Sequence, residues 1–261
     1  MNHFIGSLST EFIKIRNSFA FWLLLLGAGF MPGLVFFVVM TKWKNFIPKT
    51  GENTWTAYTE ISWKGMAFLY TNFWVVLLMC LVLNIEHKSI AWKHLFTLPV
   101  KRSSLYLYKY LTLLILFASL YGLFIPFWLV SGNLLGILHP ELKMLSTKPD
   151  YLYLLNTCFH SFVATLGVFA IHFWMSIRFK NMIIPIGFAI VSGIVFVALF
   201  QGRAPELVYY PYSYNYLTVN PQQFVSNNQI GVFAIHEIFS LLYFAVFSLL
   251  SYVDFVKWFK E

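Results

Sequence analysis

The chain has 261 residues, of which 59% are hydrophobic, 20% are aromatic and only 11% are charged, and its formal net charge at pH 7 is +8. A soluble domain is about 45–50% apolar and about 25% charged, so this composition excludes an ordinary soluble protein and indicates a membrane protein. The basic residues lie in short connectors between apolar runs, which favours anionic lipid headgroups and an acidic protein surface as partners, and not nucleic acid.

Residues 2–17 precede the first long apolar run and are interpreted as a separate short helix. Four apolar residues recur in this segment at helical spacing: Phe4, Leu8, Phe12 and Ile15. This pattern is typical of a helix that lies along the lipid headgroups. A cytoplasmic tail without regular structure is the alternative.

Six runs of about 20 mostly apolar residues follow, and each is long enough to cross a bilayer as an α-helix. They are residues 19–40, 66–85, 105–130, 151–177, 182–200 and 231–256. The sequence therefore predicts an all-α integral membrane protein with six transmembrane helices, which form a single transmembrane domain over residues 1–261.

Two longer connectors are rich in aromatic side chains, which favour the boundary between lipid and water. Residues 41–65 contain Trp43, Trp55, Trp63 and Tyr58, and we expect these side chains to form an aromatic belt. The outer loop at 201–230 contains the run YYPYSYNY. This loop either enters the outer leaflet as a re-entrant segment or runs along the interface as an ordinary loop.

The Lys and Arg residues of the connectors predict the orientation of the chain in the membrane. If the N-terminus is cytoplasmic, 11 of the 18 Lys and Arg residues lie on the inside. Positive charge favours the cytoplasmic side, so both termini are expected to be cytoplasmic.

The sequence contains no motif for ATP binding, hydrolysis or metal binding. It lacks G-x-x-x-x-G-K-[ST], H-E-x-x-H, G-x-S-x-G and C-x-x-C, and its seven histidines show no metal-ligand spacing. We therefore expect that the chain is not an enzyme and that it holds no metal and no cofactor of its own.

Glu237 is a carboxylate inside the sixth predicted span, near its outer end and next to His236. Ionisable groups within a membrane are costly and often functional. Glu237 and His236, with His172 as a pairing neighbour, are therefore a candidate intramembrane polar site that lines a substrate path. The alternative is structural, because Glu237 lies within two turns of the helix start and can reach water or headgroups from there.

Residues 86–98 predict a short cytoplasmic helix between the second and third spans. Glu86, Lys93 and His94 fall on its polar side, and Pro99 ends it because proline disfavours the helical conformation of the preceding residue. The alternative is a helix at the interface that carries positive-inside charge. That alternative explains the lysines but does not require an exposed polar face or a sharp end. An exposed polar face with a sharp end favours docking into a groove on a soluble partner.

The same residues resemble a known family. Glu86 and the stretch LFTLPVKRSSLYLYK at 95–109 resemble the cytoplasmic segment of type-2 ABC exporter permeases, and TEFIKIRNSFAFWL at 10–23 resembles their entry to the first span. The resemblance covers the whole chain in layout and these two stretches in motif. Many members carry Gly-Thr after the glutamate, where this chain has Lys88 and Ser89. The segment also resembles permeases of lantibiotic or bacteriocin self-protection.

The resemblance implies the transmembrane subunit of an ATP-driven transporter in a bacterial cytoplasmic membrane. It implies a homodimer, or a heterodimer with a related permease, that works with separate ATP-binding cassette ATPase subunits, which bind ATP and Mg. The substrate class would be a hydrophobic or amphipathic peptide, lipid or drug, exported by alternating access. Residues 86–98 would be the coupling helix, and four residues would contact the ATPase: Glu86, Lys93, His94 and Arg102.

Two other functions are compatible with the residues. A non-transporting membrane scaffold or sensor subunit predicts that no ATPase is bound. An intramembrane enzyme predicts that substitution of His172, His236 or Glu237 removes an activity, and the scarcity of polar residues in the spans argues against it.

Overall fold

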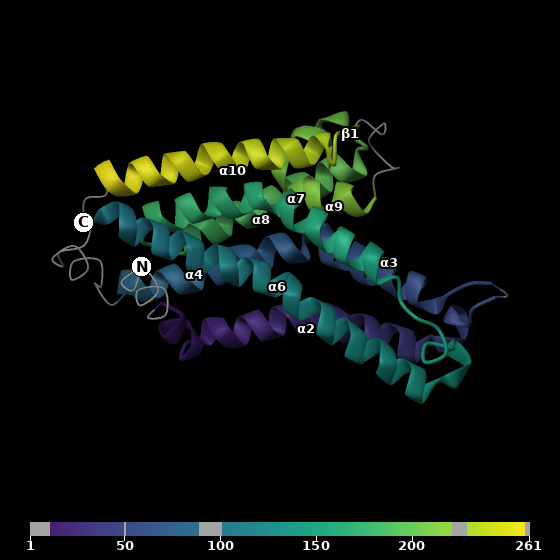
Figure 1. Ribbon diagram of the computed structural model, residues 1–261. Coiled ribbons are helices and arrows are strands. Elements are labelled where there is room, and N and C mark those ends of the chain that lie inside the picture. The colour runs from purple at the N-terminus through teal and green to yellow at the C-terminus, as the bar shows by residue number, and fades with distance from the viewer. Residues whose placement is uncertain (1–10, 50, 89–100, 221–228, 259–261) are drawn as a thin grey trace.

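The protein is a bundle of long helices (Figure 1), and the computed structural model describes residues 11–49, 51–88, 101–220 and 229–258. Within these residues, six helical segments are long and apolar enough to cross a membrane. Their bounds are Phe19–Thr41, Thr54–Ile85, Arg102–Leu138, Tyr151–Arg178, Ile183–Gln201 and Ile235–Lys257. The predicted all-α membrane fold is therefore confirmed.

The long helices are α2 (Phe19–Thr41), α3 (Thr54–Gly65), α4 (Thr71–Lys88), α6 (Arg102–Leu138), α7 (Tyr151–Arg178), α8 (Ile183–Gln201) and α10 (Ile235–Val253). Two π-helical segments connect or continue these helices. Segment η2 (Met66–Tyr70) joins α3 to α4, and segment η7 (Asp254–Trp258) continues α10. The connectors hold the 3₁₀ helices η1 (Trp43–Phe46), η3 (Pro140–Leu142), η4 (Pro205–Tyr209) and η5 (Pro211–Ser213), and the short helix α9 (Tyr214–Val219). Strands β1 (Gln229–Ile230) and β2 (Phe233–Ala234) pair antiparallel, with Gln229 opposite Ala234.

The bundle has two ends, and each holds its own set of connectors and helix termini. Helix α2 begins and α10 ends at the same end, which we call the terminal end (Figure 1). The opposite end holds η1, η3, α9 and the β1–β2 hairpin, and we call it the loop end. Three of the helices have polar N-cap residues, namely Ser18 for α2, Asn53 for α3 and Asp150 for α7. Each N-cap side chain accepts a hydrogen bond from a backbone amide in the first turn of its helix.

Two helix pairs make the most extensive contacts, α10 with α7 and α2 with α6. The 37-residue helix α6 crosses the bundle diagonally and lies near α10 at the terminal end and near α2 at the loop end (Figure 1). Its buried aromatic residues Phe117, Tyr121, Phe124 and Trp128 belong to the main hydrophobic core. The outward faces of α2 and α8 carry exposed apolar side chains, such as Trp22 and Ile194, as expected for surfaces that contact lipid tails.

The second span begins 12 residues earlier than the sequence predicted, and this corrects the expected aromatic belt. Trp55, Tyr58 and Trp63 lie on α3, and each is at most 2% exposed. The Trp55 indole stacks at a tilt on Trp128 of α6, with ring centroids 4.9 Å apart, and its Nε1 donates to the Met144 carbonyl at 2.9 Å. These rings pack inside the protein because α6 offers them an apolar surface. Ser131 of α6 also bonds to the Tyr58 hydroxyl at 2.7 Å.

The tyrosine-rich loop packs into the bundle. Tyr212, Tyr214 and Tyr216 are buried, and α9 contacts α7, η2 and α10. The Asn72 amide of α4 donates to the Tyr212 carbonyl at 2.9 Å. The hydroxyl of Tyr210 donates to the Ser192 carbonyl of α8, also at 2.9 Å. The loop therefore serves as a packing element between spans, whichever depth in the membrane it takes.

Two predicted helices fall partly outside the described residues, and residues 221–228 of the predicted outer loop fall outside them as well. Of the predicted N-terminal helix at 2–17, residues 11–16 are helical, and residues 1–10 lie outside the description. Of the predicted coupling helix at 86–98, residues 86–88 form the end of α4, and residues 89–98 lie outside it. Both segments therefore stay predictions in their remaining parts.

Candidate functional site

A buried ion pair at the terminal end joins the two stretches that carry the sequence motifs. Lys109 Nζ of α6 lies 3.6 Å from Glu11 Oε2, and Lys14 Nζ donates to Glu11 Oε1 at 2.9 Å. The side chain of Lys109 is 4% exposed and that of Glu11 is 14% exposed. The segment before the first span is thus fixed against the start of α6.

The electrostatic environment of Glu11 favours its charged form. Burial alone would raise the pKa of this carboxyl, but the positive charges of Lys109 and Lys14 and their hydrogen bonds outweigh burial and lower the pKa below its ordinary value. A carboxyl whose pKa is lowered by folding stabilises the folded state above the ordinary pKa of 4.5. That contribution is lost as the pH falls through the lower pKa of the folded state.

We expect Glu11→Gln and Lys109→Met each to lower the free energy of unfolding by about 2 kcal/mol, because each leaves a largely buried polar group without its partner. The double variant should lose less than the sum of the two single losses. Equilibrium unfolding in mixed micelles at neutral pH measures all three values. The exposed pair Glu60 and Lys64, changed in the same way, is the control and should cost at most about 1 kcal/mol. Strictly additive losses would rule out the coupling of Glu11 to Lys109.

Further polar contacts at the terminal end connect the other helices. His87 Nε2 of α4 lies 3.0 Å from the Ser176 carbonyl of α7. Arg178 at the end of α7 pairs with Asp254 of η7 at 3.2 Å. The Tyr106 hydroxyl of α6 donates to the Ser248 carbonyl of α10 at 2.9 Å. Together with the Glu11–Lys109 pair, these contacts are called the terminal-end contacts, and they link α4, α6, α7 and α10 to one another.

The predicted coupling residues lie at this end as far as they are described. Glu86 belongs to the last turn of α4, and its side chain lies outside the described part of the structure. Lys93 and His94 also lie outside the described residues. Arg102 is the first residue of α6 and is exposed. Sequence reasoning missed the pairing of Glu11 with Lys109, although a lysine among apolar residues early in a span is a signal of a buried partner.

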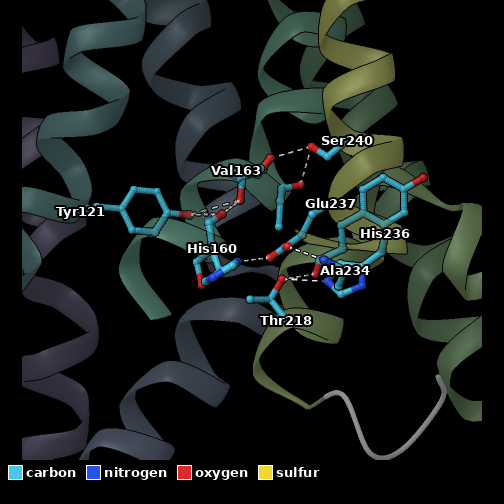
Figure 2. A network of polar contacts seen from close by, with 12 residues as sticks. Tyr121, His160, Val163, Thr218, Ala234, His236, Glu237 and Ser240 are labelled. Atoms are coloured by element: carbon cyan, nitrogen blue, oxygen red, sulfur yellow. Dashed lines mark hydrogen bonds and ion pairs between the residues drawn. The ribbon is translucent and has the colours of Figure 1, made fainter. Parts of the chain in front are cut away.

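A second polar cluster lies at the loop end, where α10 begins beside α7 (Figure 2). Glu237 is 2% exposed, and its Oε1 lies 2.8 Å from Nδ1 of His160. Its Oε2 accepts the Ala234 amide at 2.8 Å, which satisfies a backbone donor at the start of α10. The structure thus pairs Glu237 with His160, where the sequence suggested His172, and it buries the carboxylate side chain.

The neighbouring polar side chains tie α10 to α7 and α9. His236 Nε2 lies 3.0 Å from Thr218 Oγ1, and the Thr218 hydroxyl donates to the Tyr214 carbonyl at 3.0 Å. One turn further along α10, Ser240 Oγ lies 2.8 Å from the Val163 carbonyl (Figure 2). We call Glu237, His160, His236 and Thr218 the loop-end cluster.

His172 is separate from this cluster. It is buried on α7, and its Nε2 is hydrogen-bonded to the Tyr212 hydroxyl. The structure therefore brings together two of the three predicted intramembrane residues, His236 and Glu237, and adds His160, which sequence reasoning did not select. In the described part of the chain, no group of three or more His, Cys, Asp or Glu side chains is placed to hold a metal ion.

The comparison with known proteins identifies a family for most of the chain. A family model described as ABC-2 family transporter protein matches residues 7–196. The match includes both stretches that carry the sequence motifs, and therefore both partners of the Glu11–Lys109 pair. No curated protein and no solved structure matches the chain.

Proposed function

Because the chain belongs to the ABC-2 family of transporter proteins and is a permease subunit, we propose that it exports a hydrophobic or amphipathic substrate across the bacterial cytoplasmic membrane. Separate ATP-binding cassette subunits would bind ATP and Mg and drive alternating access. The peptide class of substrate is favoured by the resemblance to permeases of self-protection. The exposed apolar faces of α2, α8 and α10 support a substrate that reaches the protein from the lipid.

The terminal-end contacts carry this proposal. Helices α4 and α6 flank residues 89–101, where we propose that the coupling helix docks on the ATPase through Glu86, Lys93, His94 and Arg102. The end of α4 is bonded to α7 through His87, and the start of α6 is bonded to α10 through Tyr106. A displacement of the coupling helix is therefore passed to four helices at once, as rigid-body rocking between two access states requires.

We further propose that the permease works as a dimer, with itself or with a related permease. The two ATPase subunits close around ATP, and each of them must move one pair of membrane helices. A second copy of the coupling segment supplies the second docking point. Identification of the copurified proteins measures the composition of the complex directly.

The test is a purification of the tagged chain from native membranes in gentle detergent, with identification of the bound proteins. We expect an ATP-binding subunit to copurify with the wild-type chain and to be lost from a Glu86→Ala, Lys93→Ala double variant. The control double variant Glu60→Ala, Lys64→Ala removes the same residue types from an exposed pair on α3 and should retain the ATPase. A chain that purifies without any ATPase in several detergents would favour the scaffold or sensor function instead.

A further inference from the structure

A polar cavity lies beside the loop-end cluster. Its volume is about 270 Å³, and it is formed by the first turns of α7, the end of α9, strand β2 and the first turn of α10. Its polar lining residues are Tyr153, Asn156, Thr157, His160, Thr218, His236 and Glu237. Among the described residues that line it, there is one carboxylate and neither lysine nor arginine.

The Glu237 carboxylate keeps unused capacity to accept hydrogen bonds. A carboxylate offers about four lone-pair sites, and two donors from the described residues reach it, Nδ1 of His160 and the amide of Ala234, each at 2.8 Å. The side chain is 2% exposed, so bulk water contributes little to the remaining sites. A buried carboxylate with free acceptor sites favours a ligand that donates hydrogen bonds and carries positive charge.

His236 also lines the cavity, and one of its ring nitrogens is a second unused acceptor. The Thr218 hydroxyl already donates to the Tyr214 carbonyl, so it accepts from His236, and the neutral imidazole carries its hydrogen on Nε2. Nδ1 is then a bare acceptor. It is buried and has no hydrogen-bond partner among the described residues, and His236 as a whole is 2% exposed.

We propose that this cavity binds a primary ammonium group. An ammonium offers three N–H donors and one positive charge, which match a carboxylate and an unprotonated imidazole nitrogen. The cavity is slightly smaller than the about 300–1,000 Å³ of sites that hold whole drug-sized ligands. It therefore accommodates the amine end of a larger amphiphile. A lysine side chain of a peptide and the headgroup of an aminolipid both present this chemistry.

The inference deepens the proposed function, because it names a chemical group that the exporter recognises, and its role in transport rests on that function. Binding itself requires no ATPase. A binding measurement on the purified chain can therefore be interpreted even if the transporter proposal fails. If no binding is found, the transporter proposal is not affected.

The experiment is calorimetric titration of the full chain in nanodiscs of phosphatidylglycerol, a lipid without an amine. The probes form two matched pairs. N-acetyl-lysine amide is compared with its Nε-trimethyl form, and glycerophosphoethanolamine is compared with glycerophosphocholine. Each second member keeps the positive charge and lacks the N–H donors. We expect saturable binding of at least one ammonium probe, about tenfold tighter than that of its trimethylated partner.

The variants test the two acceptors separately. Glu237→Gln keeps the shape of the side chain and can still accept the Ala234 amide, and it should weaken binding about tenfold. His236→Phe removes Nδ1 and should weaken binding as well. Glu206→Gln is the matched control, because Glu206 is exposed on η4 and does not line the cavity, and it should bind like the wild type.

The outcomes separate the sources and decide the proposal. Binding of the lysine probe alone identifies a peptide amine, and binding of the headgroup probe alone identifies an aminolipid. Equal binding of a trimethylated probe, wild-type binding by Glu237→Gln, or no saturable binding of either ammonium probe would overturn the proposal. The probe comparison on the wild-type chain decides the matter even if a variant fails to fold.

Discussion

Glu86→Ala is expected to abolish ATP-driven transport while the amount of folded protein in the membrane stays unchanged. Glu86 lies in the last turn of α4, where the resemblance places the acidic residue before the coupling helix. Truncation of one member of a charged contact at an interface costs about 2–5 kcal/mol of binding. Such a loss uncouples the ATPase from α4 without disturbing the spans, because the position lies at the helix end.

The measurement is ATP hydrolysis and substrate export by the copurified complex in proteoliposomes. Insertion is checked by the yield of monodisperse protein after extraction. Glu60→Ala serves as control, since it removes the same charge from an exposed site on α3. Export at the wild-type rate by Glu86→Ala would refute the role of this residue in coupling.

Gly132→Ala is expected to destabilise the protein by about 3 kcal/mol, the range seen when a packed core is overfilled. A Cβ at this position of α6 would lie 2.4 Å from two ring atoms of Trp55. The indole cannot move away easily, because Nε1 is bonded to the Met144 carbonyl and the ring packs on Trp128. The apparent unfolding temperature in detergent should fall by about 5–10 °C.

Gly122→Ala is the matched control on the same helix. Nothing lies within 4 Å of its added Cβ, and alanine is favoured over glycine in a helix interior by up to about 1 kcal/mol. This variant should be neutral or slightly stabilised. Combining Gly132→Ala with Trp55→Leu should recover part of the loss, and equal effects of both glycine variants would contradict the close approach of α3 to α6.

The apolar runs predict the six spans well because the length of a membrane helix is set by the bilayer. The same reasoning started the second span too late, at residue 66 and not at Thr54. Thr54–Gly65 contains polar residues such as Thr59 and Ser62, whose side chains bond to backbone carbonyls of their own helix. The tryptophans of this segment are buried by α6, and an aromatic belt and a buried aromatic cluster have the same local sequence.

The polar pairs could be predicted only in part. Glu237 and His236 were recognisable as costly residues in an apolar run. The partner of Glu237 was not recognisable, because His160 lies on another helix and the packing of α7 against α10 decides which histidine faces the carboxylate. The same holds for Glu11 and Lys109, since each stands in a sequence motif but only the fold shows that the two motifs meet.

The length of α6 has a mechanical consequence. At 1.5 Å per residue, its 37 residues extend about 55 Å, nearly twice the thickness of a hydrocarbon core of about 30 Å. The helix is continuous through Pro126, so it can tilt as one rigid rod that begins beside the proposed ATPase contact. A tilt of about 5° about its first residues moves the far end by about 5 Å, which is roughly one helical turn. A small rotation at the terminal end thus becomes a large displacement at the loop end, where Gly132 of α6 packs against Trp55.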